Sequence, residues 1–486
     1  MLNIKSGGNT MEIKIKSGQK VKAYPLIPAQ SLMLYVSRHH SKDAPVLNIV
    51  TGYYWQGDFD TETMKEALYE AMDRCDTMRL RFTRRPFNKV YQYLADKHEI
   101  EIIEEDLSSM SWDDAHEFLK QRSHSIIDMY EKPVNEIRII HLENGYNGIY
   151  MKLHHLAFDG YSSKAFLADA LSIYFHKKYG TAYPKPMRSY IEMVEKELKY
   201  PKSEQHKKDV AFWKGTIKNE PEPIYTDYVR PSRLIRQRIE KKKPDLRKAE
   251  VLDNNPESRT LRFSLDAETS EKLMKMCSER SLSLPCVLMM GMRSALSSFN
   301  NDEKDISYKV MVNRRATLLD KKSGGVRMHF FSMRNIVEPE MTFEEAVRVI
   351  EKAQNDIFEH SNMGSMEAVM LRHLAMKCGP RYTYECITFS YHPHFPMPYY
   401  GEEMKKSSRG FWYNNDASVQ PLYLTVMHRS YDNGLDFNFE YRIANNPVDE
   451  LHHFYDKMLD TFLLGIENPD IKVSEILAKI KKDKVK

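Results

Sequence analysis

At residues 153–162 the sequence reads LHHLAFDGYS, and the rest of the predicted fold is built outward from this stretch. Gly148 to His154 has strand character, an Asp-Gly turn follows, and Ser163 to Tyr179 has apolar residues at helical spacing. The paired histidines therefore end a strand, where a rigid element holds an imidazole beside a loop. Successive side chains of a strand point to opposite faces, so one ring is expected to reach a reaction space and the other to pack inward.

This stretch offers the parts of a general base. An imidazole has an ordinary pKa of about 6.5, so the neutral ring can accept a proton at pH 7. Asp159 can orient the ring or hold an arginine that fixes the loop, and Gly160 lets a substrate approach the backbone. The same residues also fit a buried, hydrogen-bonded histidine pair beside an ordinary turn. No Glu or Cys stands nearby at metal-ligand spacing, so no metal site is predicted.

Strands and helices alternate on both sides of this stretch, which predicts an α+β fold. Val46 to Tyr54 reads as a strand, and Asp60 is placed to cap a helix that runs to Asp73. An Asn-Gly step predicts a hairpin between strands at 137–142 and 148–154. The segment 230–259 is dense in charge and reads as a linker. The pattern then restarts, with strands expected at 259–265, 306–313, 329–337, 384–391, 422–429 and 434–442 and helices at 266–280, 283–299, 343–358 and 449–464.

Composition excludes several classes of protein. The chain has 486 residues and a formal net charge of +4, without the strongly basic face that a nucleic-acid binder needs. Its longest apolar run, Leu284 to Met292, is too short to span a bilayer. The five cysteines form no CxxC pair, so free, mostly buried thiols in a reducing compartment are expected. The N-terminus has no apolar stretch typical of a secretory signal, and the expected location is the cytoplasm.

Several motifs, in order along the chain, carry a resemblance to a known family. Residues 154–160, HHLAFDG, match the HHxxxDG signature of the condensation domains of nonribosomal peptide synthetases, within the chloramphenicol acetyltransferase-like superfamily. Residues 28–35, PAQSLMLY, resemble the family's opening motif S-x-A-Q-x-R-L-W, and residues 74–82 resemble R-H-E-x-L-R-T-x-F. Phe212-Trp213 and residues 312–315, VNRR, also resemble family segments. Residues 325–334 follow the G-x-F-V-N-T-L-P-x-R motif only loosely, with His329 in place of its Asn.

The resemblance implies a fold of two chloramphenicol acetyltransferase-like α/β sandwich halves, arranged as a V-shaped pseudo-dimer with an active-site tunnel between them. On this basis residues 1–23 are an N-terminal extension, 24–183 the first half with the HHxxxDG motif, and 184–486 the second half with the charged crossover segment. The implied chemistry joins an acyl or aminoacyl thioester to an amine or hydroxyl acceptor.

The resemblance also assigns roles to residues. His155 is the general base or positioning residue, Asp159 is structural and pairs with an arginine, and Gly160 contributes to the catalytic loop. His154 and Arg315 support the site, Arg315 being preferred to Arg314 by its alignment with the family arginine. The residues expected to line the tunnel are Tyr161, Ser162, His329 and His392.

Partners and alternatives follow from the same resemblance. No cofactor is expected to be bound, because phosphopantetheine or coenzyme A carries the substrate as a thioester. The partners are then an acyl or peptidyl carrier protein, or an acyl-coenzyme A, together with an amine or alcohol acceptor. One alternative is a coenzyme A-dependent O- or N-acyltransferase of a small molecule. Another is a non-catalytic binding protein on the same fold.

Overall fold

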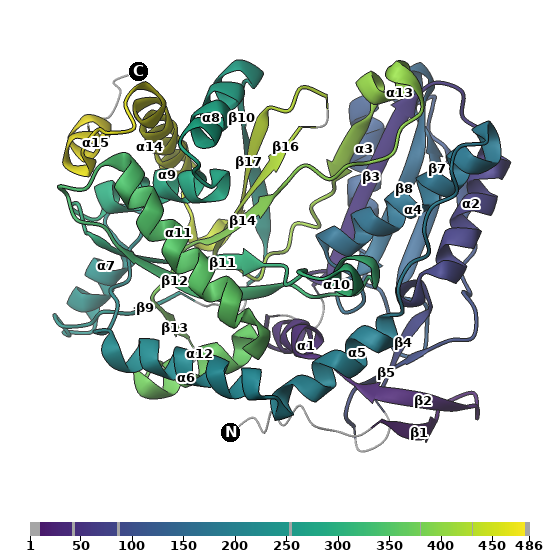
Figure 1. The fold of residues 1–486 in the computed structure, drawn as a ribbon, viewed down its shortest axis with the longest axis horizontal. Coiled ribbons are helices and arrows are strands. Elements are labelled where there is room, and N and C mark those ends of the chain that lie inside the picture. Colours follow the sequence, from purple (N-terminus) through teal and green to yellow (C-terminus); the bar gives the residue numbers. More distant parts are fainter. Residues whose placement is uncertain are drawn as a thin grey trace. The chain divides into compact units, whose positions relative to one another are not determined.

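The strand that ends at the histidine pair lies inside a five-stranded sheet. The computed structural model describes residues 10–40, 44–84, 88–251, 255–379, 381–429 and 431–481. In it, β8 is paired antiparallel with β3 on one side and with β7 on the other (Figure 1). The sheet order is β15–β3–β8–β7–β6, with bounds β3 (Asn48–Gln56), β6 (Ile103–Asp106), β7 (Asn135–His141), β8 (Tyr146–His154) and β15 (Arg409–Trp412).

The hairpin predicted at the Asn-Gly step is confirmed. β7 and β8 are joined by a short 3₁₀ turn, Glu143–Gly145. Asn144 has φ 57° and Gly145 has φ 72°, the left-handed conformation that these two residue types adopt most readily. The turn fixes the register of the two strands, and so it fixes where β8 ends and where the histidines stand.

Two compact units share the chain. Unit one contains the described residues up to His206 together with Asn313–Met328 and Phe395–Ala417, and unit two contains the remaining described residues. In unit one the predicted cap is confirmed, because Thr63 N–H donates to Asp60 at 2.6 Å. The helices of unit one are α1 (Pro28–His40), α2 (Thr61–Arg74), α3 (Trp112–Arg122), α4 (Gly160–Tyr179), α5 (Tyr190–Lys199), α10 (Leu318–Lys322) and α13 (Gly401–Ser407).

The N-terminal residues form part of a second sheet in unit one. Its order is β1–β2–β5–β4, with bounds β1 (Met11–Lys14), β2 (Lys20–Pro25), β4 (Leu80–Thr83) and β5 (Tyr91–Leu94). The alternation of lysine with single apolar residues is the strand pattern itself, since Ile13, Val21 and Ala23 are buried. The sequence pattern alone had predicted no structure for this segment.

Unit two contains a six-stranded sheet with one face covered by helices. Its order is β10–β17–β16–β14–β11–β12, with bounds β10 (Ser258–Leu265), β11 (Asp305–Val312), β12 (His329–Ile336), β14 (Thr388–His392), β16 (Leu422–His428) and β17 (Leu435–Arg442). The central helix of the core, α9 (Leu284–Phe299), is buried along most of its length. The other helices are α8 (Ala267–Glu279), α11 (Phe343–His360), α12 (Ser365–Ala375), α14 (Val448–Glu467) and α15 (Val473–Ile480).

The segment read as a charged linker has structure of its own. It contains α7 (Arg233–Glu240) and β9 (Ala249–Glu250), which pairs with β13 (Tyr382–Thr383). Dense charge concealed this helix, whose N-cap is Ser232. The turn predicted at 253–256 lies partly outside the described residues. The helix before this segment, α6 (Glu204–Asn219), contains the change from unit one to unit two.

Two predictions from composition can be compared with the structure. All five cysteines are buried, free thiols, as predicted. Within the described ranges no single helix is both long and apolar enough to cross a membrane; α8 and α9 pass that test only as a pair, and the pair bends by 113°.

A substitution at Gly148 tests the packing of the sheet that carries the histidines. A Cβ at this position would lie 2.0 Å from the Tyr53 carbonyl oxygen, whereas a Cβ at Gly410, in β15 of the same sheet, meets nothing within 4 Å. We expect Gly148→Ala to lower the free energy of unfolding by about 3 kcal/mol, measured by urea denaturation. Gly410→Ala is the control and should differ little from the wild type. Equal stability of the two variants would contradict the packing described here.

Candidate functional site

His155 is held by its own loop. Its backbone N–H donates to Leu47 O at 2.7 Å, and its ring Nδ1 lies 2.9 Å from Phe158 O. A carbonyl oxygen can only accept, so Nδ1 carries the proton and the neutral ring has its lone pair on Nε2. Burial lowers the pKa of His155, although the Asp159 charge and the hydrogen bond to Phe158 oppose that shift. The ring is therefore neutral at pH 7, with Nε2 ready to accept a proton.

His154 lies in the same loop, but its ring accepts an internal hydrogen bond instead of donating one. It is buried, and its Nδ1 accepts from the N–H of Leu156 at 3.1 Å. Burial, and then the nearby His155, lower the pKa of His154 to about 3. The ring is thus fixed as a neutral acceptor inside the protein, and the inward packing expected of one of the two histidines is that of His154.

The carboxylate of Asp159 binds four donors. Arg315 Nη1 and Nη2 each approach one carboxylate oxygen at 2.9 Å, and the backbone N–H groups of Ser162 and Arg327 donate at 2.9 Å each. The side chains of Asp159 and Arg315 are 3 % and 1 % exposed. Burial alone would raise the pKa of Asp159, but the Arg315 charge and these hydrogen bonds outweigh it and hold the pKa below its ordinary value.

Asp159 also fixes the start of α4. It is the N-cap residue, and Ser162 completes a capping box by accepting from the Asp159 N–H at 2.9 Å. Asp159 accepts hydrogen bonds from the N–H groups of Ser162 and Ser163. The N–H groups of Gly160 and Tyr161 lie in the first turn and have no acceptor within the helix. The first turn of α4 therefore offers hydrogen-bond donors beside the histidine loop. Ser162, expected to line a tunnel, is buried in this cap.

A second layer of buried charges holds the arginine in place. Arg315 Nη2 also donates to Gly325 O at 2.8 Å. Glu197, on α5, binds Arg314 at 3.0 Å and Arg327 at 3.2 Å. Gly325 has φ 80°, and a Cβ there would lie 2.3 Å from the Tyr190 ring. The segment 313–328 thus depends on a glycine to bring its carbonyl and arginines against the rest of unit one.

Gln30 connects the opening motif to the histidine loop. Its Nε2 lies 3.1 Å from Leu156 O, 2.8 Å from Gln92 Oε1 and 3.0 Å from Tyr190 Oη. Sequence reasoning recognised this glutamine as part of a motif but gave it no role. A buried amide at the start of an apolar helix was the signal that could have found it, because such a group requires partners. Glu197 and Arg327 were missed because their partners are distant in sequence.

The remaining predicted residues divide between the two units. In unit one, the Tyr161 ring lies 4.7 Å from the Arg315 guanidinium carbon and makes an edge contact with Phe395. In unit two, His329 is fully buried and its Nδ1 accepts from Ser365 N–H at 3.2 Å. His392 ends β14 and is partly exposed. His329 is therefore part of the buried packing at the start of α12, through its hydrogen bond with Ser365.

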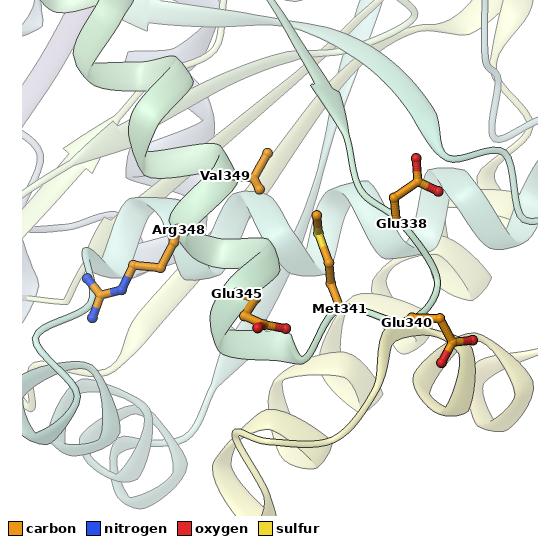
Figure 2. Close-up of a pocket in the computed structure, with 6 residues that line it drawn as sticks. All are labelled: Glu338, Glu340, Met341, Glu345, Arg348 and Val349. Carbon is orange, nitrogen blue, oxygen red and sulfur yellow. The ribbon is translucent and has the colours of Figure 1, made fainter.

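A surface pocket in unit two, of about 430 Å³, is lined by three carboxylates over an apolar floor (Figure 2). Each carboxylate is already used: Glu338 pairs with Lys304, Glu340 with Lys472, and Glu345 accepts from the N–H of Thr342. Within the described part of the chain, no group of three or more His, Cys, Asp or Glu side chains is placed to hold a metal ion. The histidine loop is therefore the strongest candidate for chemistry.

Removal of the Asp159 carboxylate should be costly because Arg315 would keep a buried, unpaired charge. We expect Asp159→Ala to lower the free energy of unfolding by about 3–5 kcal/mol. Asp60→Ala is the matched control, since Asp60 caps α2 but is exposed. That variant should lose only about 1 kcal/mol. Chemical denaturation measures both, and a loss at Asp159 no larger than that at Asp60 would contradict the role of the ion pair.

The pKa of His154 predicts a pH dependence of stability. The unfolded chain protonates this histidine below about pH 6.5, whereas the folded chain does so only near 3. Stability contributed by His154 is therefore complete above pH 6.5 and is lost as the pH falls, by up to about 1.4 kcal/mol per pH unit. We expect His154→Gln to show a shallower loss between pH 6.5 and 5 in urea titrations. Parallel curves would contradict a neutral, buried His154.

Comparison with known proteins gives one consistent result. The sequence profile described as "Condensation domain" matches residues 20–484. Gramicidin S synthase 2 of Brevibacillus brevis is 19 % identical over 482 residues, which is 95 % of this chain and 10 % of the relative. Bacitracin synthase 1 of Bacillus licheniformis is 19 % identical over 454 residues, 93 % of this chain and 8 % of the relative. The chain thus spans about a tenth of the length of these relatives.

Solved structures agree in fold. The first condensation domain of the calcium-dependent antibiotic synthetase, in complex with a substrate analogue, has a TM-score of 0.73 at 17 % identity, covering 93 % of this chain and 99 % of that one. A starter condensation domain of rhizomide synthetase in complex with C8-CoA has a TM-score of 0.75 at 17 % identity, covering 93 % and 96 %. The match over residues 20–484 shows that this chain belongs to the condensation-domain family.

Proposed function

We propose that this chain is a condensation-type acyltransferase that joins an acyl or aminoacyl thioester to an amine or hydroxyl acceptor, with His155 as general base. One observation carries the proposal: Nδ1 of His155 is occupied by the Phe158 carbonyl, so the lone pair stands on Nε2. Family membership supports the class of reaction. The class of the acceptor, an amine or hydroxyl, and the class of the donor, an acyl or aminoacyl thioester, belong to this proposal.

The proposed reaction proceeds in two steps. The acceptor attacks the thioester carbonyl carbon, and His155 Nε2 takes the proton of the attacking amine or hydroxyl. The carbonyl oxygen becomes an oxyanion, for which the open N–H groups of Gly160 and Tyr161 are suitable donors. The tetrahedral intermediate then collapses, the C–S bond breaks, and the imidazolium returns its proton to the departing thiolate. An amide or ester and a free thiol are the products.

The thioester carrier in this proposal is phosphopantetheine on a carrier protein, or coenzyme A. A solved relative in complex with C8-CoA favours including coenzyme A donors in any test. The proposed location is the cytoplasm, where both kinds of thioester are available. The proposed reaction uses only the two substrates and the protein, because His155 supplies the base and Asp159 holds the loop that carries it.

Thiol release tests the proposal directly. Purified protein is mixed with acyl-coenzyme A and acyl-carrier thioesters and with pooled amines and alcohols. We expect acceptor-dependent release that falls about 10²–10⁴-fold in His155→Ala. Stability should fall by only about 0.5–1.5 kcal/mol, because one hydrogen bond is lost. His124→Ala, at an exposed histidine of the same unit, is the control. Release that survives in His155→Ala would remove this residue from the mechanism.

The lowered pKa of His155 predicts the shape of the pH–rate profile. Only the neutral ring accepts a proton, so the rate follows the fraction of neutral His155. Because burial lowers this pKa below about 6.5, the acid limb of the profile lies at lower pH than for an ordinary histidine. We expect kcat at pH 6.5 to remain above half of its value at pH 8, so that the midpoint of the acid limb lies below pH 6.5. A steep decline already above pH 7 would contradict a base with a lowered pKa.

A further inference from the structure

Lys164 is a cation on the helix that follows the histidine loop. It lies on α4, five residues after Asp159, and it is partly buried. Burial lowers the pKa of its ammonium group, and no charged neighbour contributes to that shift. Among the described residues, no carboxylate or hydrogen-bond acceptor engages this ammonium. Lys152 is the contrasting case in the same unit, because it donates to Arg122 O and to the Ser125 hydroxyl.

Lys164 lies early in α4, the helix that begins directly after Asp159. Side chains of an α-helix lean toward the helix N-terminus and cover the preceding turn. For Lys164 that turn contains Gly160 and Tyr161, whose N–H groups have no helical acceptor. The N-terminal end of α4 carries a partial positive charge, and the Asp159 carboxylate that caps it is already paired with Arg315, so the Lys164 ammonium would be stabilised by a further anion bound there.

The described residues of unit one on either side of Lys164 do not supply that anion. Its helical neighbours at i±3 and i±4 are Gly160, Tyr161, Leu167 and Ala168, none of them acidic. Asp159 binds Arg315, and Asp169 pairs with Arg74. Residues 395–400, FPMPYY, contact α4 at Tyr161 near its start and at Tyr179 at its end, and they contain no acidic residue.

We propose that Lys164 binds an anionic oxygen group of the thioester donor, either a carboxylate on the acyl chain or the phosphate of pantetheine. This inference rests on the proposed function, since it assigns a substrate class to the same site. An anion of the donor would pair with the ammonium and with the positive end of α4. Lys164 is then a specificity-determining residue that favours anionic over neutral donors.

Binding measurements test the proposal without turnover. The probes are thioether analogues, in which a methylene group replaces the thioester carbonyl. One pair compares a neutral acyl chain on N-acetylcysteamine with the same chain ending in a carboxylate. A second pair compares a neutral chain on pantetheine with the same chain on phosphopantetheine. Calorimetry gives the Kd of each probe for the full chain, and the two pairs distinguish carboxylate from phosphate.

We expect the wild type to bind the anionic member of one pair about tenfold or more tightly than the neutral member. Lys164→Met should abolish that preference, whereas Lys164→Arg should retain it. Lys177→Met is the matched control, since Lys177 lies on α4 but is exposed and paired with Glu70. No preference in the wild type, or a preference that survives in Lys164→Met, overturns the proposal.

The two hypotheses fail separately. Thiol release that is unchanged in His155→Ala would remove the proposed catalytic role of His155, but it would not affect a measured preference for anionic probes. A missing anion preference removes the role of Lys164 but leaves His155-dependent transfer of neutral acyl groups intact.

Discussion

The buried carboxylate of Asp159 is the constraint on which the rest of the candidate site depends. A charge of this kind is tolerated inside a protein only when its lone pairs are used, and here two guanidinium nitrogens and two backbone N–H groups use them. One side chain therefore begins α4, fixes Arg315 and ends the histidine loop. His155 keeps its orientation because Phe158 O, which fixes its tautomer, directly precedes this anchored residue.

Local chemistry made much of the fold predictable. The hairpin between β7 and β8 follows from Asn144 and Gly145, and the starts of α2 and α8 follow from Asp60 and Asp266, whose side chains cap them. Each of these signals lies within a few residues of the element that it determines. The alternation of neighbouring side chains along a strand likewise predicts that His154 and His155 point in opposite directions.

Other parts could not be predicted because their causes are distant in sequence. Gln30 meets Leu156, and Glu197 meets Arg314 and Arg327, across more than a hundred residues. Periodicity describes one element at a time and cannot reveal such pairs. Two errors were local instead. The charges of α7 concealed a helix, and the lysines of the first residues concealed the strand alternation of β1 and β2. In β1 and β2 the charged side chains occupy the exposed positions of the strands, whereas α7 buries Arg233 and exposes Ile235 and Ile239.

The two late segments of unit one, 313–328 and 395–417, also affect how the protein is made. On the ribosome the chain emerges from its N-terminus, so β3 and β8 are present long before Arg315 and the edge strand β15. At ordinary rates of synthesis the roughly 110 residues from His206 to Arg315 take on the order of 5–20 s, and the roughly 200 residues from His206 to β15 take on the order of 10–40 s. Asp159 has no guanidinium partner during the first interval, and β3 has an open edge during the second. The nascent chain is then most exposed to proteolysis and to misdirected strand pairing.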